Sequence, residues 1–163
     1  MHSLTHRFSH RHSDSAGDAI RAGGGRCMIR GRKGRRILIV EDHFALRQHL
    51  LVLLQALEPD CQVVDTGTLS DARRLLTTTP VDGLLVDVRL PDGSGLDFAS
   101  EFRAAYPDTP IVVMSAFDAT ELRKRVDRVA NATFIRKFEV GDRWRTLLVD
   151  LLNRRQPESV NHQ

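Results

Sequence analysis

The sequence is poor in cysteine and has no long apolar run, and each absence excludes a class of protein. Its 163 residues include two cysteines, Cys27 and Cys61, which form no CxxC pair and lie far apart along the chain. This spacing suits neither a zinc site nor a disulfide framework, so we expect a reducing, cytoplasmic environment. The longest apolar runs, such as LLVLL at 50–54, fall far short of the roughly 20 residues that cross a bilayer, so we expect no membrane partner.

The composition fits one globular domain, but charge is divided unevenly along the chain. Hydrophobic residues make up 41% and charged residues 28%, which allows a sizeable core. Residues 1–36 hold nine Lys or Arg against two Asp, a net charge of +7, whereas residues 37–163 hold fifteen against nineteen, a net charge of −4. The formal net charge of +3 therefore conceals a basic N-terminal segment joined to an acidic remainder.

The basic segment, residues 1–35, is rich in His, Ser, Gly and Arg and has no sustained helix or strand period. Such a segment buries too little apolar surface to fold alone, so we expect a disordered tail. No apolar stretch of about 7–15 residues follows its charges, which argues against a secretory signal. A mitochondrial-type presequence stays open, because such segments are also rich in Arg and Ser. Residues 156–163 are expected to form a short disordered C-terminal tail.

Strand and helix patterns alternate from residue 36 to residue 155. Strand patterns cover 36–40, 61–67, 81–88, 109–117 and 133–138, and helix patterns cover 44–57, 69–80, 95–107, 118–131 and 141–155. Strands that alternate with helices predict parallel pairing through right-handed crossovers, with helices on both faces of the sheet. We therefore expect residues 36–155 to form one doubly wound α/β domain, (βα)5, around a five-stranded parallel sheet.

Polar side chains end four of the five predicted strands. Glu41 and Asp42 follow the first strand, and the ends of the third, fourth and fifth carry Asp87, Ser115 and Lys137. Ligands of an open doubly wound sheet bind at the carboxyl ends of its strands, near the point where the strand order reverses. We therefore expect these five side chains to be neighbours in space.

Three carboxylates in a partly buried crevice repel one another and need a counter-charge. Oxygen ligands and high negative charge suit Mg²⁺, which keeps several waters and can share its coordination shell with a phosphate. Lys137 would add a second positive charge and Ser115 a hydroxyl donor. Such a set of groups suits phosphoryl transfer, with an aspartate as the nucleophile that forms an aspartyl phosphate.

Four segments of the chain carry a family resemblance. They are ILIVEDH (37–43), GLLVDVRLPDGSG (83–95), IVVMSA (111–116) and FIRK (134–137), and in order and spacing they resemble the receiver domain of bacterial two-component response regulators. The resemblance covers about residues 36–155. It implies a flavodoxin-like fold in which the five strands, numbered along the chain, lie in the order 2-1-3-4-5.

The resemblance also implies a role for each site residue. The roles are phosphoacceptor for Asp87, Mg²⁺ ligation for Glu41, Asp42, Asp87 and the main-chain carbonyl of Arg89, the family's lysine for Lys137, the switch hydroxyl for Ser115 and the switch aromatic for Phe134. Two neighbouring positions depart from the family pattern, since Phe138 stands where proline is usual and Thr133 where glycine is common.

Several of these residues also have a purely structural explanation. Aspartate is common in turns, so Asp87 taken alone would suit a strand end, and Ser115 and Lys137 taken alone would suit solvated loops. The segment PDGSG (91–95) is expected to be a structural turn. His43 follows the acidic pair, but we expect it to be exposed at the start of the first helix and not to bind metal.

Functions of three classes remain open. We expect a single-domain response regulator that accepts a phosphoryl group on Asp87 from a histidine kinase or a phosphotransfer protein in a phosphorelay. Helix 118–131, strand 133–138 and helix 141–155 would then form the face that binds a downstream protein or a second copy.

The alternatives are a DNA-associated regulator and an enzyme. A transcription-associated regulator would contact DNA non-specifically through the basic tail. Eight residues follow Arg155, too few for a helix-turn-helix, so we do not expect sequence-specific DNA binding. Phosphatases with an aspartyl nucleophile carry a second aspartate at the position of Arg89, so we do not expect an enzyme.

Overall fold

The computed structural model describes residues 34–117, 120–139 and 142–154. Residues 1–33 of the predicted basic tail and the predicted C-terminal tail, 156–163, lie outside the described residues. Along the described ranges, strands and helices alternate in the order that was predicted. The structure also contains one small hairpin that was not predicted.

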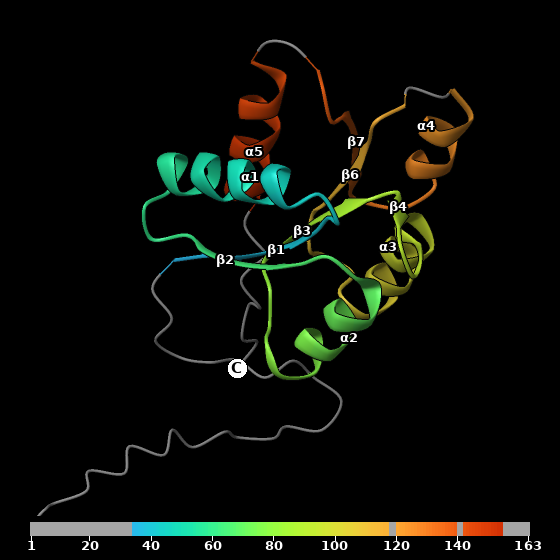
Figure 1. The fold of residues 1–163 in the computed structure, drawn as a ribbon, viewed down its shortest axis with the longest axis horizontal. Coiled ribbons are helices and arrows are strands. Elements are labelled where there is room, and N and C mark those ends of the chain that lie inside the picture. Colours follow the sequence, from blue (N-terminus) through green and yellow to red (C-terminus); the bar gives the residue numbers. More distant parts are fainter. Residues whose placement is uncertain (1–33, 118–119, 140–141, 155–163) are drawn as a thin grey trace, which may run out of the picture. The chain divides into compact units, whose positions relative to one another are not determined.

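Five parallel strands form the main sheet (Figure 1). They are β1 (Arg36–Val40), β2 (Gln62–Thr66), β3 (Gly83–Asp87), β6 (Ile111–Ser115) and β7 (Ala132–Arg136). Their order is β2-β1-β3-β6-β7, so the predicted order 2-1-3-4-5 is confirmed. Because the order reverses between β1 and β3, the carboxyl ends of these strands flank the crevice where doubly wound sheets bind ligands.

Helices cover both faces of this sheet. They are α1 (Phe44–Leu57), α2 (Leu69–Thr78), α3 (Gly95–Ala105), α4 (Thr120–Asp127) and α5 (Arg143–Asn153). In Figure 1, α1 and α5 lie on one face, and α2, α3 and α4 lie on the other. The predicted doubly wound, flavodoxin-like architecture is therefore confirmed. No helix in the described ranges is both long and apolar enough to cross a membrane.

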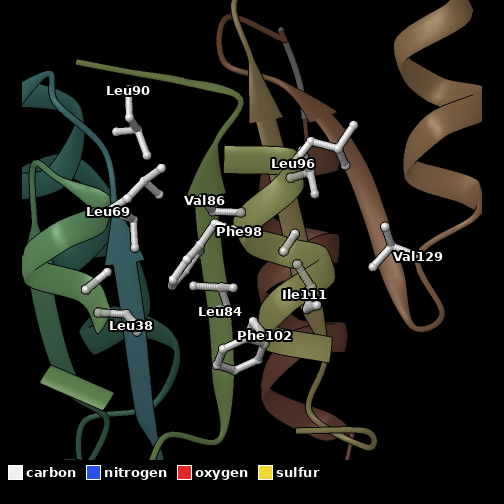
Figure 2. Close-up of a cluster of buried hydrophobic side chains, with 14 of the residues drawn as sticks. Leu38, Leu69, Leu84, Val86, Leu90, Leu96, Phe98, Phe102, Ile111 and Val129 are labelled. Carbon is white, nitrogen blue, oxygen red and sulfur yellow. The ribbon is translucent and has the colours of Figure 1, made fainter. Parts of the chain in front are cut away.

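Each central strand is buried on both of its faces. Ile37 and Ile39 of β1 pack with α1 and α5, whereas Leu38 and Val40 pack with the helices of the opposite face. All four side chains are fully buried. Figure 2 shows the cluster on the second face, where Phe102 of α3 lies close to the sheet. Burial on both faces explains why these strands read as continuous apolar runs.

The first three helices each begin at a polar side chain. His43, Thr68 and Ser94 accept a hydrogen bond from the backbone N–H three residues further along the chain. Each bond satisfies an amide that has no partner within the helix. His43 is exposed, as predicted, and its imidazole serves the start of α1.

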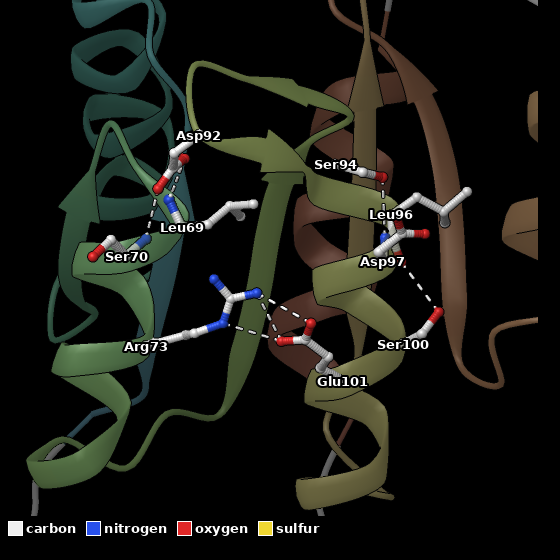
Figure 3. A network of polar contacts seen from close by, with 9 residues as sticks. All are labelled: Leu69, Ser70, Arg73, Asp92, Ser94, Leu96, Asp97, Ser100 and Glu101. Carbon is white, nitrogen blue, oxygen red and sulfur yellow. Dashed lines mark hydrogen bonds and ion pairs between the residues drawn. The ribbon is translucent and has the colours of Figure 1, made fainter.

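The segment PDGSG contains the turn and the second strand of a small antiparallel hairpin, formed by β4 (Arg89–Leu90) and β5 (Gly93–Ser94), which the sequence analysis did not predict. At its tip the Asp92 carboxylate accepts hydrogen bonds from the amides of Leu69 and Ser70, at 2.9 and 2.8 Å (Figure 3). These bonds lower the pKa of Asp92, because they stabilise its charged form. The predicted turn thus also anchors the first turn of α2.

The fourth helix is shorter than its sequence pattern. The pattern covers 118–131, whereas α4 ends at Asp127 and residues 128–131 form turns and bends. The Val129 amide donates to the carbonyl of Val126, three residues back, and Asn131 has a left-handed φ of 56°. The predicted end of this helix at Asn131 was therefore wrong, and the left-handed Asn131 could not have been a helical residue.

Helix α3 begins directly against the backbone of the third strand. A Cβ atom added to Gly95 would lie 1.8 Å from the carbonyl oxygen of Asp87, and the Gly95 amide donates to the carbonyl of Val88 at 2.9 Å. Because the contact is with backbone rather than with a flexible side chain, there is no room for any residue other than glycine. The absence of this side chain lets the helix support the strand end that carries Asp87.

We therefore expect Gly95→Ala to lower the free energy of unfolding by about 3 kcal/mol, the upper end of the usual cost of overpacking. Urea titration followed by circular dichroism measures the change. The matched control is Ser100→Ala, an exposed position on the same helix, which should change stability by less than about 0.5 kcal/mol. Equal stabilities of the two variants would contradict the proposed backbone contact.

Candidate functional site

The carboxyl ends of the central strands bring the predicted site residues together. Glu41 follows β1, Asp87 ends β3, Ser115 ends β6 and Lys137 follows β7. The Lys137 amide donates to the carbonyl of Ser115 at 2.8 Å, which continues the pairing of β6 and β7 to the edge of the sheet. The polar residues therefore meet because parallel strands end at one edge.

Three carboxylates gather at this edge. Glu41, Asp42 and Asp87 each place one oxygen within 4.8 Å of the others. Glu41 is fully buried and Asp87 is 5% exposed, whereas Asp42 is exposed to solvent. The cluster thus combines two buried charges with one that faces water, which leaves it open on one side.

Lys137 is the counter-charge of the two buried carboxylates. Its Nζ lies 2.8 Å from Glu41 Oε1 and 2.7 Å from Asp87 Oδ2, and its side chain is 9% exposed. Burial alone would lower the pKa of Lys137, but its bonds to Asp87 and Glu41 outweigh burial and leave that pKa raised. The lysine therefore remains a cation in the folded protein.

The charged form of Glu41 remains disfavoured despite its contact with Lys137. Burial raises its pKa, and the nearby charge of Asp87 raises it further, while the hydrogen bond from Lys137 offsets only part of the effect. Oε1 accepts bonds from Lys137 and from the amide of His43, but Oε2 is buried and has no hydrogen-bond partner among the described groups. An unsatisfied buried carboxylate oxygen is costly, so this atom suits a site that binds a cation.

A hard dication fits this set of donors. The cluster offers oxygen atoms only, as Mg²⁺ prefers, and one of them is the unpartnered Oε2 of Glu41. Arg89, whose main-chain carbonyl the resemblance implies as a further ligand, begins β4 two residues after Asp87. The position of that strand next to the carboxylates is compatible with this role, which stays a prediction.

Ser115 ends β6, whereas Phe134 lies in the middle of β7, opposite Val113. Ser115 is buried, and its hydroxyl oxygen accepts a hydrogen bond from the amide of Phe117 at 3.1 Å. Phe134 is 6% exposed within the core, and the Arg123 guanidinium lies 4.8 Å from its ring centroid. The serine thus holds the loop after β6, and the phenylalanine ring is in an inward position.

The departure at Phe138 leaves a large exposed side chain next to the site. Phe138 follows Lys137 directly and is 76% exposed. Within the described ranges all peptide bonds are trans, including the bond between these two residues. Phenylalanine therefore adds an apolar side chain to the rim of the acidic cluster where the family usually has proline.

One residue of the site was missed by the sequence analysis. Arg47 of α1 donates to the main-chain carbonyls of Glu41 and Asp42 and pairs with Asp65 of β2. The sequence did offer one signal: in the helix FALRQHLLVLLQAL, Arg47 is the one residue that is Lys, Arg, Asp or Glu. That signal does not reveal its partners, which only the folded chain brings near.

Comparisons with known proteins identify relatives of this chain. Residues 37–147 match the family described as the response regulator receiver domain. The chain is 30% identical over 125 residues to the response regulator protein PilR of Pseudomonas aeruginosa, and 34% identical over 110 residues to the transcriptional regulatory protein PdtaR of Mycobacterium tuberculosis. These alignments cover 77% and 66% of this chain, respectively.

A solved structure gives the same result for the fold. The non-phosphorylated HemR receiver domain of Leptospira biflexa is 29% identical and superposes with a TM-score of 0.64, over 76% of this chain and 98% of that domain. By contrast, the alignments span 28% of PilR and 52% of PdtaR, so the chain corresponds to only part of these relatives.

The ion pairs of Lys137 lead to a prediction about stability. In buffer without divalent cations, Lys137→Met should lower the free energy of unfolding by about 3–5 kcal/mol, because it leaves two buried carboxylates without a counter-charge. Without the lysine the pKa of Glu41 rises further, so between its ordinary value of 4.5 and its folded value the native state binds more protons than the unfolded state. Stability of the variant should therefore fall as the pH rises through this window.

Chemical denaturation at mildly acidic and at neutral pH measures this effect. Lys124→Met is the control, because Lys124 is an exposed lysine whose partner Glu121 lies on the same helix. It should change stability by less than about 1 kcal/mol at either pH. A loss for Lys137→Met that is as small as the control's would show that the buried carboxylates do not need this cation.

Proposed function

Because the chain belongs to the response regulator receiver domain family of two-component systems, whose members are signalling domains and not enzymes, we propose that it accepts a phosphoryl group on Asp87. A histidine kinase or a histidine phosphotransfer protein in the cytoplasm is the proposed donor. The observation that carries the proposal is the buried lysine that bridges Glu41 and Asp87 beside an unsatisfied carboxylate oxygen.

The phosphoryl transfer requires a nucleophile in a fixed position and a positive charge that stabilises the phosphoryl oxygens. An oxygen of the Asp87 carboxylate attacks the phosphorus of a phosphohistidine; the new O–P bond forms as the N–P bond breaks, and the imidazole leaves with the electron pair and takes up a proton. Asp87 ends a strand whose residues are all buried, so the rigid sheet holds its carboxylate in place. Lys137 Nζ, 2.7 Å from Asp87 Oδ2, can follow the negative charge onto the phosphoryl oxygens.

The proposed cofactor is Mg²⁺, held by the carboxylates of Glu41, Asp42 and Asp87 and by the main-chain carbonyl of Arg89. When bound, it neutralises charge on the transferring phosphoryl group. The all-oxygen donor set and the unpartnered Oε2 of Glu41 support this assignment. Lys137 cannot replace the cation, because its ammonium group already contacts Glu41 Oε1 and leaves Oε2 unsatisfied.

The proposed readout uses Ser115 and Phe134. In the present structure the Ser115 hydroxyl oxygen accepts a hydrogen bond from the amide of Phe117. A phosphoryl group on Asp87 would give the hydroxyl proton a charged acceptor, and this charge-assisted bond would draw Ser115 toward Asp87. Movement of the loop after β6 would then give the Phe134 ring a second packing arrangement, and so alter the surface formed by α4, β7 and α5. This surface is the proposed face for a downstream protein or a second copy of the chain.

The first test of this function is labelling with a small acyl phosphate donor. Wild type in Mg²⁺ should gain one phosphoryl group that hydroxylamine removes, and Asp87→Asn should gain none, because an amide is not a competent nucleophile. Intact mass spectrometry measures both. Asp97→Asn, an exposed aspartate at the start of α3, is the control and should label like wild type. Labelling of Asp87→Asn at the wild-type level would sink the proposal.

A second test separates phosphorylation from its readout. Ser115→Ala should still be labelled on Asp87, because the serine does not supply the nucleophile, but labelling should no longer change association with a partner or a second copy. A switch responds only to a ligand that interacts differently with its two states, and the hydroxyl provides that difference here. Mass spectrometry reports the labelling and light scattering reports the association. If the labelled variant changes its association as wild type does, Ser115 is not the switch.

A further inference from the structure

The guanidinium of Arg47 contacts the main chain of two residues of the acidic cluster, Glu41 and Asp42. Its Nη1 donates to the carbonyl oxygen of Glu41 at 2.5 Å and to that of Asp42 at 3.2 Å. On its other side, Nε donates to Asp65 Oδ2 of β2 at 2.9 Å. Arg47 therefore joins α1, β2 and the loop between β1 and α1 through one side chain.

The surroundings of this guanidinium restrict its movement. The side chain of Arg47 is 15% exposed, and a Cβ atom added to Gly67 would lie only 3.3 Å from Nη1, so the turn after β2 passes close by. Phe44 contributes its ring on another side, with its centroid 5.6 Å from the guanidinium carbon. A guanidinium held on several sides is a rigid donor, unlike a solvated surface arginine.

The two carbonyls that Arg47 contacts belong to the two residues whose side chains are the proposed metal ligands after β1. The backbone of Glu41 is also tied to β2, because its amide donates to the carbonyl of Thr66 at 2.9 Å. Asp42 is exposed, so packing does little to orient it, and the bond from Arg47 to its carbonyl restrains the peptide unit that follows it.

We propose that Arg47 is a positioning residue of the cation site: by holding the carbonyls of Glu41 and Asp42, with Asp65 as its anchor, it orients their carboxylates toward one Mg²⁺ ion. The inference rests on the proposed function, because it assumes that this cluster binds Mg²⁺. Partners that orient metal ligands from outside the coordination shell commonly influence affinity as much as some of the ligands do.

The sign of the expected effect separates positioning from simple electrostatics. Arg47 is a cation beside a site for a dication, so through charge alone it weakens Mg²⁺ binding. Removing its charge should therefore strengthen binding if charge is all that it contributes. If Arg47 positions the ligands, its removal should weaken binding in spite of the lost repulsion.

The test measures the Mg²⁺ dissociation constant of the full chain by isothermal titration calorimetry. Arg47→Met keeps the apolar stem and loses the donors, and we expect its dissociation constant to rise about 10-fold or more, the usual loss when such an orienting partner is removed. Arg47→Lys keeps the charge but cannot make all three bonds, so its dissociation constant should also rise, by a smaller factor. In the labelling assay, both variants should need more Mg²⁺ for half-maximal rate, whereas the rate at saturating Mg²⁺ should stay near that of wild type.

Arg73→Met is the matched control. Arg73 makes a bidentate ion pair with Glu101 between α2 and α3 (Figure 3). This pair involves none of Glu41, Asp42 and Asp87, so its loss should leave the Mg²⁺ dissociation constant unchanged. Thermal unfolding in EDTA establishes that each variant is folded before titration. If Arg47→Met does not fold, Arg47→Lys decides the question by the same criterion.

The outcomes distinguish this inference from the function on which it rests. If wild type shows no saturable Mg²⁺ binding, both the metal assignment and the role of Arg47 are wrong. If wild type binds Mg²⁺ and the folded Arg47 variants bind it equally or more tightly, only the positioning role is overturned. Weaker binding by the Arg47 variants, with Arg73→Met unchanged, supports the inference.

Discussion

Lys137 carries the cation that balances two buried carboxylates, Glu41 and Asp87, at the strand ends. Its ammonium group reaches Glu41, which is 96 residues earlier in the chain, and Asp87 in the strand between them. Buried charges of one sign are tolerated only when an opposite charge lies within contact distance. The strands that carry these three residues must therefore end together, and the acidic site exists only when the sheet is complete.

Rigid contacts surround this charged centre on each side. Gly95 lets α3 begin against the carbonyl of Asp87, and Asp92 fastens the following hairpin to the first turn of α2. Arg47 donates hydrogen bonds to the main-chain carbonyls of Glu41 and Asp42. These contacts involve no side chain of the acidic cluster, yet each restrains the main chain of a cluster member or the hairpin that follows Asp87. A site that must keep several negative charges close together needs such restraint, because their repulsion would otherwise separate the loops.

The described residues leave an excess of negative charge in the acidic cluster. One lysine faces three carboxylates, and Glu41 retains an oxygen without a partner. A bound cation or a phosphoryl group would change the net charge of the acidic cluster. Ser115 and Phe138 lie in segments next to this cluster, so their surroundings would change with that charge. Receiver domains act as signalling domains rather than enzymes.

The sequence alone determined the order of strands and helices, because burial on both faces makes each central strand a short apolar run and each amphipathic helix a longer periodic one. It also indicated the acidic cluster, since the carboxyl ends of parallel strands share one edge and polar residues follow these runs at Glu41, Asp87 and Lys137. The early end of α4 was missed, because the helix-like pattern continues through Val129 although the helix ends at Asp127. The contacts of Arg47 and Asp92 could be decided only by the tertiary structure. Their partners lie on other elements, and which donor meets which acceptor depends on distances that exist only after the sheet and its helices have packed.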